Sequence, residues 1–317
     1  MKKRFNIAIQ MDSFEKINPE EDSTYLIAKE AQLRGYKTFH YLPKDISIRN
    51  NQVIAKGCYF KILDKEKKKF KKERHITISL NKFNCILVRQ DPPFNMEYIT
   101  ATYFLEMINK NVLIVNNPTE IRNNPEKLSM FNFKKLIPDT LISQDIFEIK
   151  KFIKKNKTVI LKPLYGNGGE GIKKINYGSS IVQQTLTKMI KKYQESIIAQ
   201  KYIKEIDKGD RRIILLDGEY VGSVARIPKR GSIKANFHAG GIAKKTGYVF
   251  RDKQICKTLK PYLKKNKLFF AGIDIIGNYL TEINVTSPTG MQEINKLNGA
   301  QLEKIFWDKL EKKIKKR

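Results

Sequence analysis

Residues 271–290, AGIDIIGNYLTEINVTSPTG, place three hard oxygen donors on one short apolar hairpin. Asp274 follows an apolar run, whereas Glu282 and Asn284 lie two positions apart in a second strand and therefore share a face. Two carboxylates and an amide oxygen suit Mg²⁺, which prefers oxygen ligands and keeps positions for water and nucleotide phosphates. Taken alone, the same pattern also fits a half-buried strand whose polar side chains face solvent.

The register of this hairpin decides whether the three donors meet. Gly277-Asn278 marks the turn. A strict two-residue turn pairs Ile273 with Glu282 and sends Asp274 to the opposite face of the sheet. One extra loop residue with a bulge pairs Asp274 with Glu282 instead, and it collects all three donors on one side.

The composition indicates a folded protein with an unusual excess of positive charge. The 317 residues are 41% hydrophobic and carry a formal charge of +30, and a chain of this length has room for about two domains. Basic chains often bind nucleic acid or anionic membranes. Here the lysines are spread along the whole chain and accompany frequent Asn and Ile. This favours a genome-wide preference for AT-rich codons, and not a selected binding face, as the source of the lysines. We therefore expect no specific nucleic-acid partner, and an RNA-binding protein is the alternative from another functional class.

Cysteine usage and the N-terminus bear on the compartment. Cys58, Cys85 and Cys256 are widely spaced and odd in number, which is typical of reduced thiols. The apolar run after the N-terminal basic residues is too short and too polar for a signal peptide, and no stretch approaches a transmembrane length. We expect a cytoplasmic protein without a membrane partner.

Strands that alternate with helices predict a parallel α/β domain over residues 1–122. The segment 57–73 is charged and poorly patterned, and we expect it to be an irregular excursion. The expected strands are 5–11, 37–42, 85–88 and 112–115, and the expected helices are 24–34 and 96–110.

The pattern changes in the second part of the chain, residues 123–317. Short strands follow one another with tight turns, one of them at Asp217-Gly218, and this favours an antiparallel α+β region. The boundary is expected within 116–125, which is rich in Asn and Pro. The expected strands are 158–162, 172–176, 197–203, 212–216 and 219–227, with helices at 145–155 and 179–193.

The sequence YGNGGEG at 165–171 is a candidate phosphate-binding loop. Glycines let backbone N–H groups approach an anion closely and adopt positive φ. The loop matches G-x-G-x-x-G, but that dinucleotide fingerprint requires a helix immediately afterwards, and 172–177 alternates like a strand. We therefore expect the tip of a hairpin that closes over phosphates. A flexible surface hairpin is the alternative.

Several cations stand in positions that suit phosphate chemistry. Lys162 ends an apolar strand beside the glycine loop, and Lys127 is expected at the start of a helix. Arg212 and Arg226 lie on apolar strands, where a guanidinium needs an anionic partner because an unpaired buried charge is costly. Solvated lysines and a structural salt bridge are the alternatives. The three histidines are too far apart for a metal pair or a catalytic triad.

The order of these motifs closely resembles that of the bacterial glutathione synthetases, which belong to the ATP-grasp ligases. The resemblance runs over residues 11–293 and is weakest across 57–80. It rests on RQDPPF at 89–94, NPEKL at 124–128, ILKP at 160–163, DRR at 210–212, ARIP at 225–228, AGG at 239–241 and LTEINVTSPT at 280–289.

The resemblance implies an ATP-grasp domain with antiparallel sheets after the N-terminal α/β domain. It implies that the protein joins γ-glutamylcysteine to glycine at the expense of ATP, and that the reaction uses Mg²⁺ or Mn²⁺. It also implies that the protein forms a homotetramer. Another ATP-grasp peptide or glutamate ligase is the alternative within the class.

The resemblance also implies roles for individual residues. Lys127 and Lys162 would hold ATP phosphates. Arg226, supported by Arg212, would face an acyl phosphate. A mobile lid at 165–171 would include Gly166, Gly168, Gly169 and Gly171. The adenine would be bordered by Gln200, Lys201, Tyr202 and Ile203, with Asp210 toward the ribose or base. The metal ligands would be Asp274, Glu282 and Asn284. The γ-glutamylcysteine end would be held by Asp12, Ser13 and Arg89, with Ser287 and Thr289 as further substrate-binding residues.

Overall fold

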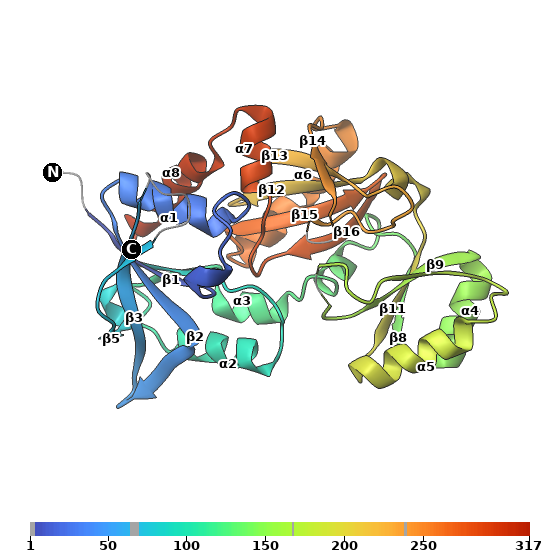
Figure 1. The fold of residues 1–317 in the computed structure, drawn as a ribbon, viewed down its shortest axis with the longest axis horizontal. Helices are drawn as coiled ribbons and strands as arrows, with labels where there is room; N and C mark the ends of the chain where they lie inside the picture. The colour runs from blue at the N-terminus through green and yellow to red at the C-terminus, as the bar shows by residue number, and fades with distance from the viewer. Residues whose placement is uncertain (1–3, 64–69, 167, 238–239) are drawn as a thin grey trace.

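The computed structural model describes residues 4–63, 70–166, 168–237 and 240–317. These residues form one mixed sheet followed by two antiparallel sheets (Figure 1). The expected order of an α/β region and then an antiparallel region is confirmed.

The N-terminal sheet is built around the buried apolar strand β1 (Asn6–Gln10). Strand β1 pairs in parallel with β2 (Lys37–Arg49) on one side and with β6 (Cys85–Val88) on the other. The last parallel strand is β7 (Leu113–Val115), which pairs with β6. The predicted βαβ opening is confirmed, because helix α1 (Ser23–Leu33) connects β1 to β2.

The prediction of an irregular excursion at 57–73 was wrong for the described residues. Strands β3 (Gln52–Ile62), β4 (Phe70–Lys72) and β5 (Ile76–Ser79) extend the sheet with antiparallel pairs, so the sheet is mixed. The hairpin between β2 and β3 turns at Asn50 and Asn51, which both adopt positive φ. The alternation of buried and exposed positions in β3 is interrupted at Gly57 and Cys58, which are both buried, and this obscures the strand pattern. Residues 64–69 lie outside the described part.

The two faces of the N-terminal sheet are covered by different helices. Helix α2 (Met96–Glu106) and the short α3 (Pro118–Asn123) belong to one face. The other face packs against α1 and against α7 (Met291–Asn298) and α8 (Leu302–Ile314) from the end of the chain. Trp307 of α8 is fully buried, and its indole N–H donates to the Ile27 carbonyl at 2.8 Å. The C-terminal helices therefore share a core with the N-terminal sheet.

The two antiparallel sheets contain four and five strands, respectively. The four-stranded sheet has the order β10 (Lys173–Asn176), β9 (Thr158–Pro163), β11 (Ile197–Lys201), β8 (Thr140–Ser143), and packs on α4 (Ile146–Asn156) and α5 (Val182–Tyr193). The five-stranded sheet has the order β14 (Ile242–Lys244), β13 (Glu219–Ile227), β12 (Asp210–Leu216), β15 (Phe270–Ile276), β16 (Tyr279–Asn284), and packs on α6 (Phe250–Lys265). Short 3₁₀ turns occur at Phe14–Lys16, Leu80–Lys82, Ser129–Phe133 and Lys204–Lys208.

The β15–β16 hairpin adopts the register that pairs Asp274 with Glu282. The turn itself has the strict two residues, because Ile276 pairs with Tyr279. The extra residue is Thr281, which forms a bulge within β16 and donates its hydroxyl to the Asp274 carbonyl at 3.0 Å. The two carboxylates therefore share a face, although the bulge lies in the strand and not in the loop.

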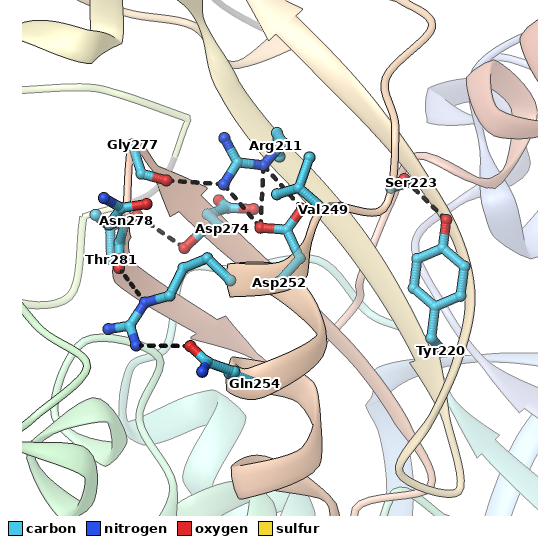
Figure 2. Close-up of polar contacts among 11 residues, drawn as sticks. Arg211, Tyr220, Ser223, Val249, Asp252, Gln254, Asp274, Gly277, Asn278 and Thr281 are labelled. Atoms are coloured by element: carbon cyan, nitrogen blue, oxygen red, sulfur yellow. Dashed lines mark hydrogen bonds and ion pairs between the residues drawn. The ribbon is translucent and has the colours of Figure 1, made fainter.

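Two arginines bind the turn of this hairpin, and Figure 2 shows the contact of Arg211 with Gly277. Arg211 of β12 donates to the Gly277 carbonyl at 2.8 Å, and Arg251 of α6 donates to the Asn278 carbonyl at 2.9 Å. Arg211 also binds both carboxylate oxygens of Asp252, whose side chain is fully buried at the start of α6. This ion pair connects the helix, the central strand and the hairpin.

We predict that Asp252→Ala lowers the free energy of unfolding by about 3 kcal/mol, because it leaves a largely buried guanidinium without its partner. Chemical denaturation followed by circular dichroism measures this change. The matched control is Glu219→Ala, which removes a half-exposed pair with Lys260 and costs less than about 1 kcal/mol. Equal losses in the two variants would contradict the role assigned to Asp252.

Candidate active site

A cavity of about 350 Å³ lies between the two antiparallel sheets, and its lining residues come from between Asp91 and Thr289. Residues after β6, the glycine loop, and strands β9, β12, β13 and β16 all contribute to it. A second cavity of about 80 Å³ adjoins it. The two share Lys162, Ile172, Asn236 and Glu282 as lining residues.

Two lysines that are distant in sequence meet at the larger cavity. Lys127 and Lys162 are both 6% exposed, although lysine is rarely buried. The Lys127 ammonium donates to the Gly166 carbonyl, and the Lys162 ammonium donates to Gln200 Oε1 at 3.2 Å. Burial lowers the pKa of Lys162. Lys127 lies in a turn before the 3₁₀ segment Ser129–Phe133, and the prediction that it starts a helix was wrong.

A buried network of two arginines and two aspartates crosses the five-stranded sheet. Arg226 binds Asp210 through two contacts of 2.6 Å, and Arg212 binds Asp274 through contacts of 2.5 and 2.9 Å. Arg226 also reaches Asp274 at 2.7 Å, which joins the two pairs. Burial alone raises the pKa of Asp274, but the attraction of Arg212 and Arg226 outweighs it and holds the pKa well below its usual range. The structural salt bridge considered from sequence is therefore present.

Glu282 and Asn284 line the larger cavity, and Asp274 and Glu282 line the smaller one. Among the described residues, no group of three or more His, Cys, Asp or Glu side chains is placed to hold a metal ion. A site formed by these three residues thus depends on the amide of Asn284.

The Asn284 amide faces a carboxylate that sequence reasoning treated only as a neighbour of Lys127. In the orientation that satisfies its contacts, the amide nitrogen of Asn284 donates to both oxygens of Glu126, each at 3.2 Å. Glu126 also lines the larger cavity. Burial raises the pKa of Glu126, and the charge of Lys127 opposes that effect. In the sequence, the only feature that pointed to Glu126 was its position in NPEKL at 124–128, beside Lys127.

The glycine loop forms one side of the larger cavity. Gly166, Gly168 and Gly169 line it, whereas Asn167 lies outside the described residues. The loop connects β9 and β10, which pair antiparallel, so the predicted hairpin tip is confirmed. Gly171 has φ of +72°, and a Cβ there would lie 2.2 Å from the Tyr193 hydroxyl. Only glycine fits at that position.

The residues predicted to border an adenine come together around the smaller cavity. They are contributed by β11, by the segment that follows it and by β12. Isoleucines supply much of the remaining wall. The predicted lining residues are Gln200, Lys201, Tyr202, Ile203 and Asp210, and the other isoleucines are Ile160, Ile172, Ile206, Ile233 and Ile276.

Two of the predicted substrate residues line a third cavity of about 220 Å³ beside the N-terminal sheet. They are Asp12, whose carboxylate accepts the Asp91 N–H at 2.8 Å, and Arg89. Arg89 is 5% exposed and donates to Thr24, while its Nη1 has no hydrogen-bond partner in the described part of the chain. Asp91 lines both this cavity and the larger one.

The other three predicted substrate residues occupy different positions. Ser13 precedes the 3₁₀ turn Phe14–Lys16, next to the third cavity but not among its lining residues. Ser287 and Thr289 line the larger cavity. The Ser287 hydroxyl donates to the Arg89 carbonyl at 3.3 Å, and the Thr289 carbonyl accepts from Arg212 at 3.3 Å.

Comparison with known proteins decides the family. Residues 5–122 match the N-terminal domain of prokaryotic glutathione synthetase, and residues 126–299 match its ATP-grasp domain. The chain belongs to the prokaryotic glutathione synthetase family. A member of this family from Agrobacterium fabrum, named glutathione synthetase, is 42% identical over 313 residues, which cover 99% of this chain and 98% of that protein. A glutathione synthetase of Buchnera aphidicola subsp. Baizongia pistaciae is 39% identical over 320 residues, covering 98% and 97%.

Solved structures with little sequence identity to this chain share its fold. The D-cycloserine synthetase DcsG has a TM-score of 0.68 at 10% identity, covering 98% of this chain and 99% of that one. The D-alanyl-alanine synthetase A of Vibrio cholerae has a TM-score of 0.61 at 11% identity, covering 99% of each chain. Within the part of this chain that the structure describes, none of the helices has the length and apolar character of a membrane span.

Proposed function

We propose that this protein joins γ-glutamylcysteine to glycine and converts ATP to ADP and phosphate. The observation that carries the proposal is the meeting of two buried lysines, two buried arginines and the glycine hairpin at one cavity, next to a cavity lined by the predicted adenine residues. Membership of the prokaryotic glutathione synthetase family supports the choice of substrates.

The reaction has two steps. A substrate carboxylate oxygen attacks the γ-phosphorus of ATP, and the bond to the β–γ bridging oxygen breaks to give an acyl phosphate and ADP. The glycine amine then attacks the acyl carbon, phosphate leaves, and the amine loses a proton. Both reactants of the first step are anions that repel each other, so preorganised cations such as Lys127, Lys162 and Arg226 lower the barrier. No side-chain nucleophile is needed.

Asp274, Glu282 and Asn284 would hold a divalent cation, Mg²⁺ or Mn²⁺. Their oxygen donors suit such an ion, and the Asn284 amide contributes its oxygen because its nitrogen faces Glu126. Asp274 would have to share its carboxylate with Arg212 and Arg226. When bound, the cation neutralises phosphate charge during transfer.

We propose that the segment 165–171 is a lid that excludes water from the acyl phosphate, which water would otherwise hydrolyse. The glycines of this segment line the larger cavity and support that role. The nucleotide base would occupy the smaller cavity beside residues 200–203, with Asp210 toward the ribose or base.

For γ-glutamylcysteine, we propose binding by Asp12, Ser13 and Arg89 at one end, with Ser287 and Thr289 nearer the phosphates. The unpartnered Nη1 of Arg89 suits a carboxylate. By resemblance, we also propose a cytoplasmic homotetramer and a division of the chain at residues 122 and 123.

We expect ADP release to require both γ-glutamylcysteine and glycine for full turnover. A coupled assay with each substrate omitted in turn measures this requirement. If glutamate or another amine acceptor replaced glycine with equal efficiency, the chain would be a different ATP-grasp ligase. Release of ADP that depends on neither substrate would contradict the proposal.

We predict that Glu282→Gln and Asn284→Ala each lower turnover by at least about a hundredfold, because the oxygens that bind a catalytic cation act in the transition state. The variants should still unfold cooperatively in a thermal melt. Steady-state assays over a Mg²⁺ titration provide the measurement. Wild-type turnover at limiting Mg²⁺ in both variants would remove the metal assignment.

We predict that Gly171→Ala raises the ratio of ADP to glutathione formed, because a Cβ would collide with Tyr193 and displace the lid. The matched control is Gly178→Ala, at φ of +83° after β10, where nothing lies within 4 Å of an added Cβ. Both variants carry left-handed strain, but only the first has the collision. The same ratio in the two variants would show that the hairpin does not act as a lid.

A further inference from the structure

Glu126 is a partly buried carboxylate that has no role in the chemistry proposed above. It lies in the turn after α3 and lines the larger cavity between Lys127 and the end of β16. Its backbone carbonyl accepts the Ile283 N–H at 3.1 Å, which fixes the turn against β16. The Thr286 hydroxyl donates to Glu126 Oε1 at 3.0 Å. Backbone and side chain therefore hold this carboxylate in one place.

The held carboxylate faces the amide of Asn284. An ionised carboxylate only accepts hydrogen bonds, whereas an asparagine amide donates at one end and accepts at the other. With the amide nitrogen turned toward Glu126, both carboxylate oxygens accept at 3.2 Å. The reverse orientation places the amide oxygen against two negative oxygens. The contact thus selects which end of the amide remains for the cavity.

We propose that Glu126 is a positioning residue, which orients Asn284 so that the amide presents its oxygen and not its nitrogen to a divalent cation. The inference rests on the proposed role of Asn284 in metal binding. It assigns Glu126 a role outside the set of ligands, since an amide nitrogen cannot bind a cation. Outer partners of this kind typically change metal affinity by about 10- to 100-fold when they are removed.

Mg²⁺ should increase the affinity of the protein for ADP, and we call this increase the Mg²⁺ gain. The proposal predicts that Glu126→Ala and Asn284→Ala lower this gain in a non-additive way. We expect Glu126→Ala to reduce this gain by about tenfold, and Asn284→Ala to reduce it by at least as much. In the double variant, Glu126→Ala should add nothing, because there is no amide left to orient. Isothermal titration of ADP with Mg²⁺ and with a chelator gives the gain for each protein.

An exchange of the two functional groups gives a sharper test. Asn284→Asp alone sets two carboxylates against each other and should weaken Mg²⁺-dependent ADP binding. Adding Glu126→Gln supplies an amide that donates to the new carboxylate, and at least about tenfold of the lost affinity should return. Glu126→Gln alone should lose part of the Mg²⁺ gain, because its amide can donate to the Asn284 oxygen as well as accept from the Asn284 nitrogen and so no longer selects one orientation.

Thr286→Val removes the hydroxyl that holds Glu126 and should cause a smaller loss. The matched control is Thr102→Val, which removes another buried hydroxyl that donates to the Ile99 carbonyl at 2.6 Å, accepts from Arg122 at 3.0 Å and does not line the cavity. Thermal melts of every variant separate binding from folding. Near-isosteric Glu126→Gln and the exchange pair keep the test informative if Glu126→Ala unfolds.

Three results would overturn the proposal. A further loss when Glu126→Ala is added to Asn284→Ala would mean that Glu126 binds the cation itself. Failure of the exchange pair to recover affinity would remove the orienting contact. An undiminished Mg²⁺ gain in Asn284→Ala would remove the ligand that is oriented. Glutathione formation by the wild-type protein, assayed in parallel, distinguishes these failures from failure of the proposed function.

Discussion

The buried ion network across β13, β12 and β15 is the constraint on which the rest of the site depends. Asp210 pairs with Arg226 across two strands, and Arg212 pairs with Asp274 across the next two, so sheet register alone brings the charges into contact. Two positive and two negative groups cancel, which makes their burial tolerable. A slip of one residue would move each side chain to the opposite face and leave four unpaired charges in the core. The network thus stabilises one register of the strands that line both cavities.

The same network fixes the positions of the two arginines that we propose to face the acyl phosphate. Arg226 and Arg212 are held by aspartates and do not need to be gathered when a substrate arrives, so little reorganisation accompanies binding. The aspartates also limit the site. Asp274 cannot contribute its full charge to a cation while two guanidinium groups compete for it. In the proposed metal site we therefore expect Glu282 and Asn284, which are not part of this network, to contribute more than Asp274.

Sequence predicted the parts of this structure that depend on local pattern. β13 agrees at both ends with the predicted strand 219–227, and the glycine loop joins paired strands as expected. The hairpin register was left open because a bulge at Thr281 has no local signature. The strand at 52–62 was missed because its alternation of buried and exposed positions is interrupted at Gly57-Cys58, where two neighbouring residues are both buried. Glu126 was missed for a different reason: its importance comes from Asn284, which lies 158 positions away.

The contacts between distant segments also explain how the two halves of the chain act as one site. Asn116, just after β7, donates to the carbonyls of Phe270 and Val285 at 2.8 and 2.7 Å and accepts the Phe270 N–H at 2.8 Å. One buried side chain thereby ties the N-terminal sheet to β15 and to the residue after β16, the hairpin that carries the proposed metal donors. Because α8 also packs on α1, the N-terminal sheet is held at two places. These contacts place the cavity that contains Arg89 beside the larger cavity, with Asp91 lining both, and the proposed transfer needs such an arrangement because its reactants must be held close together.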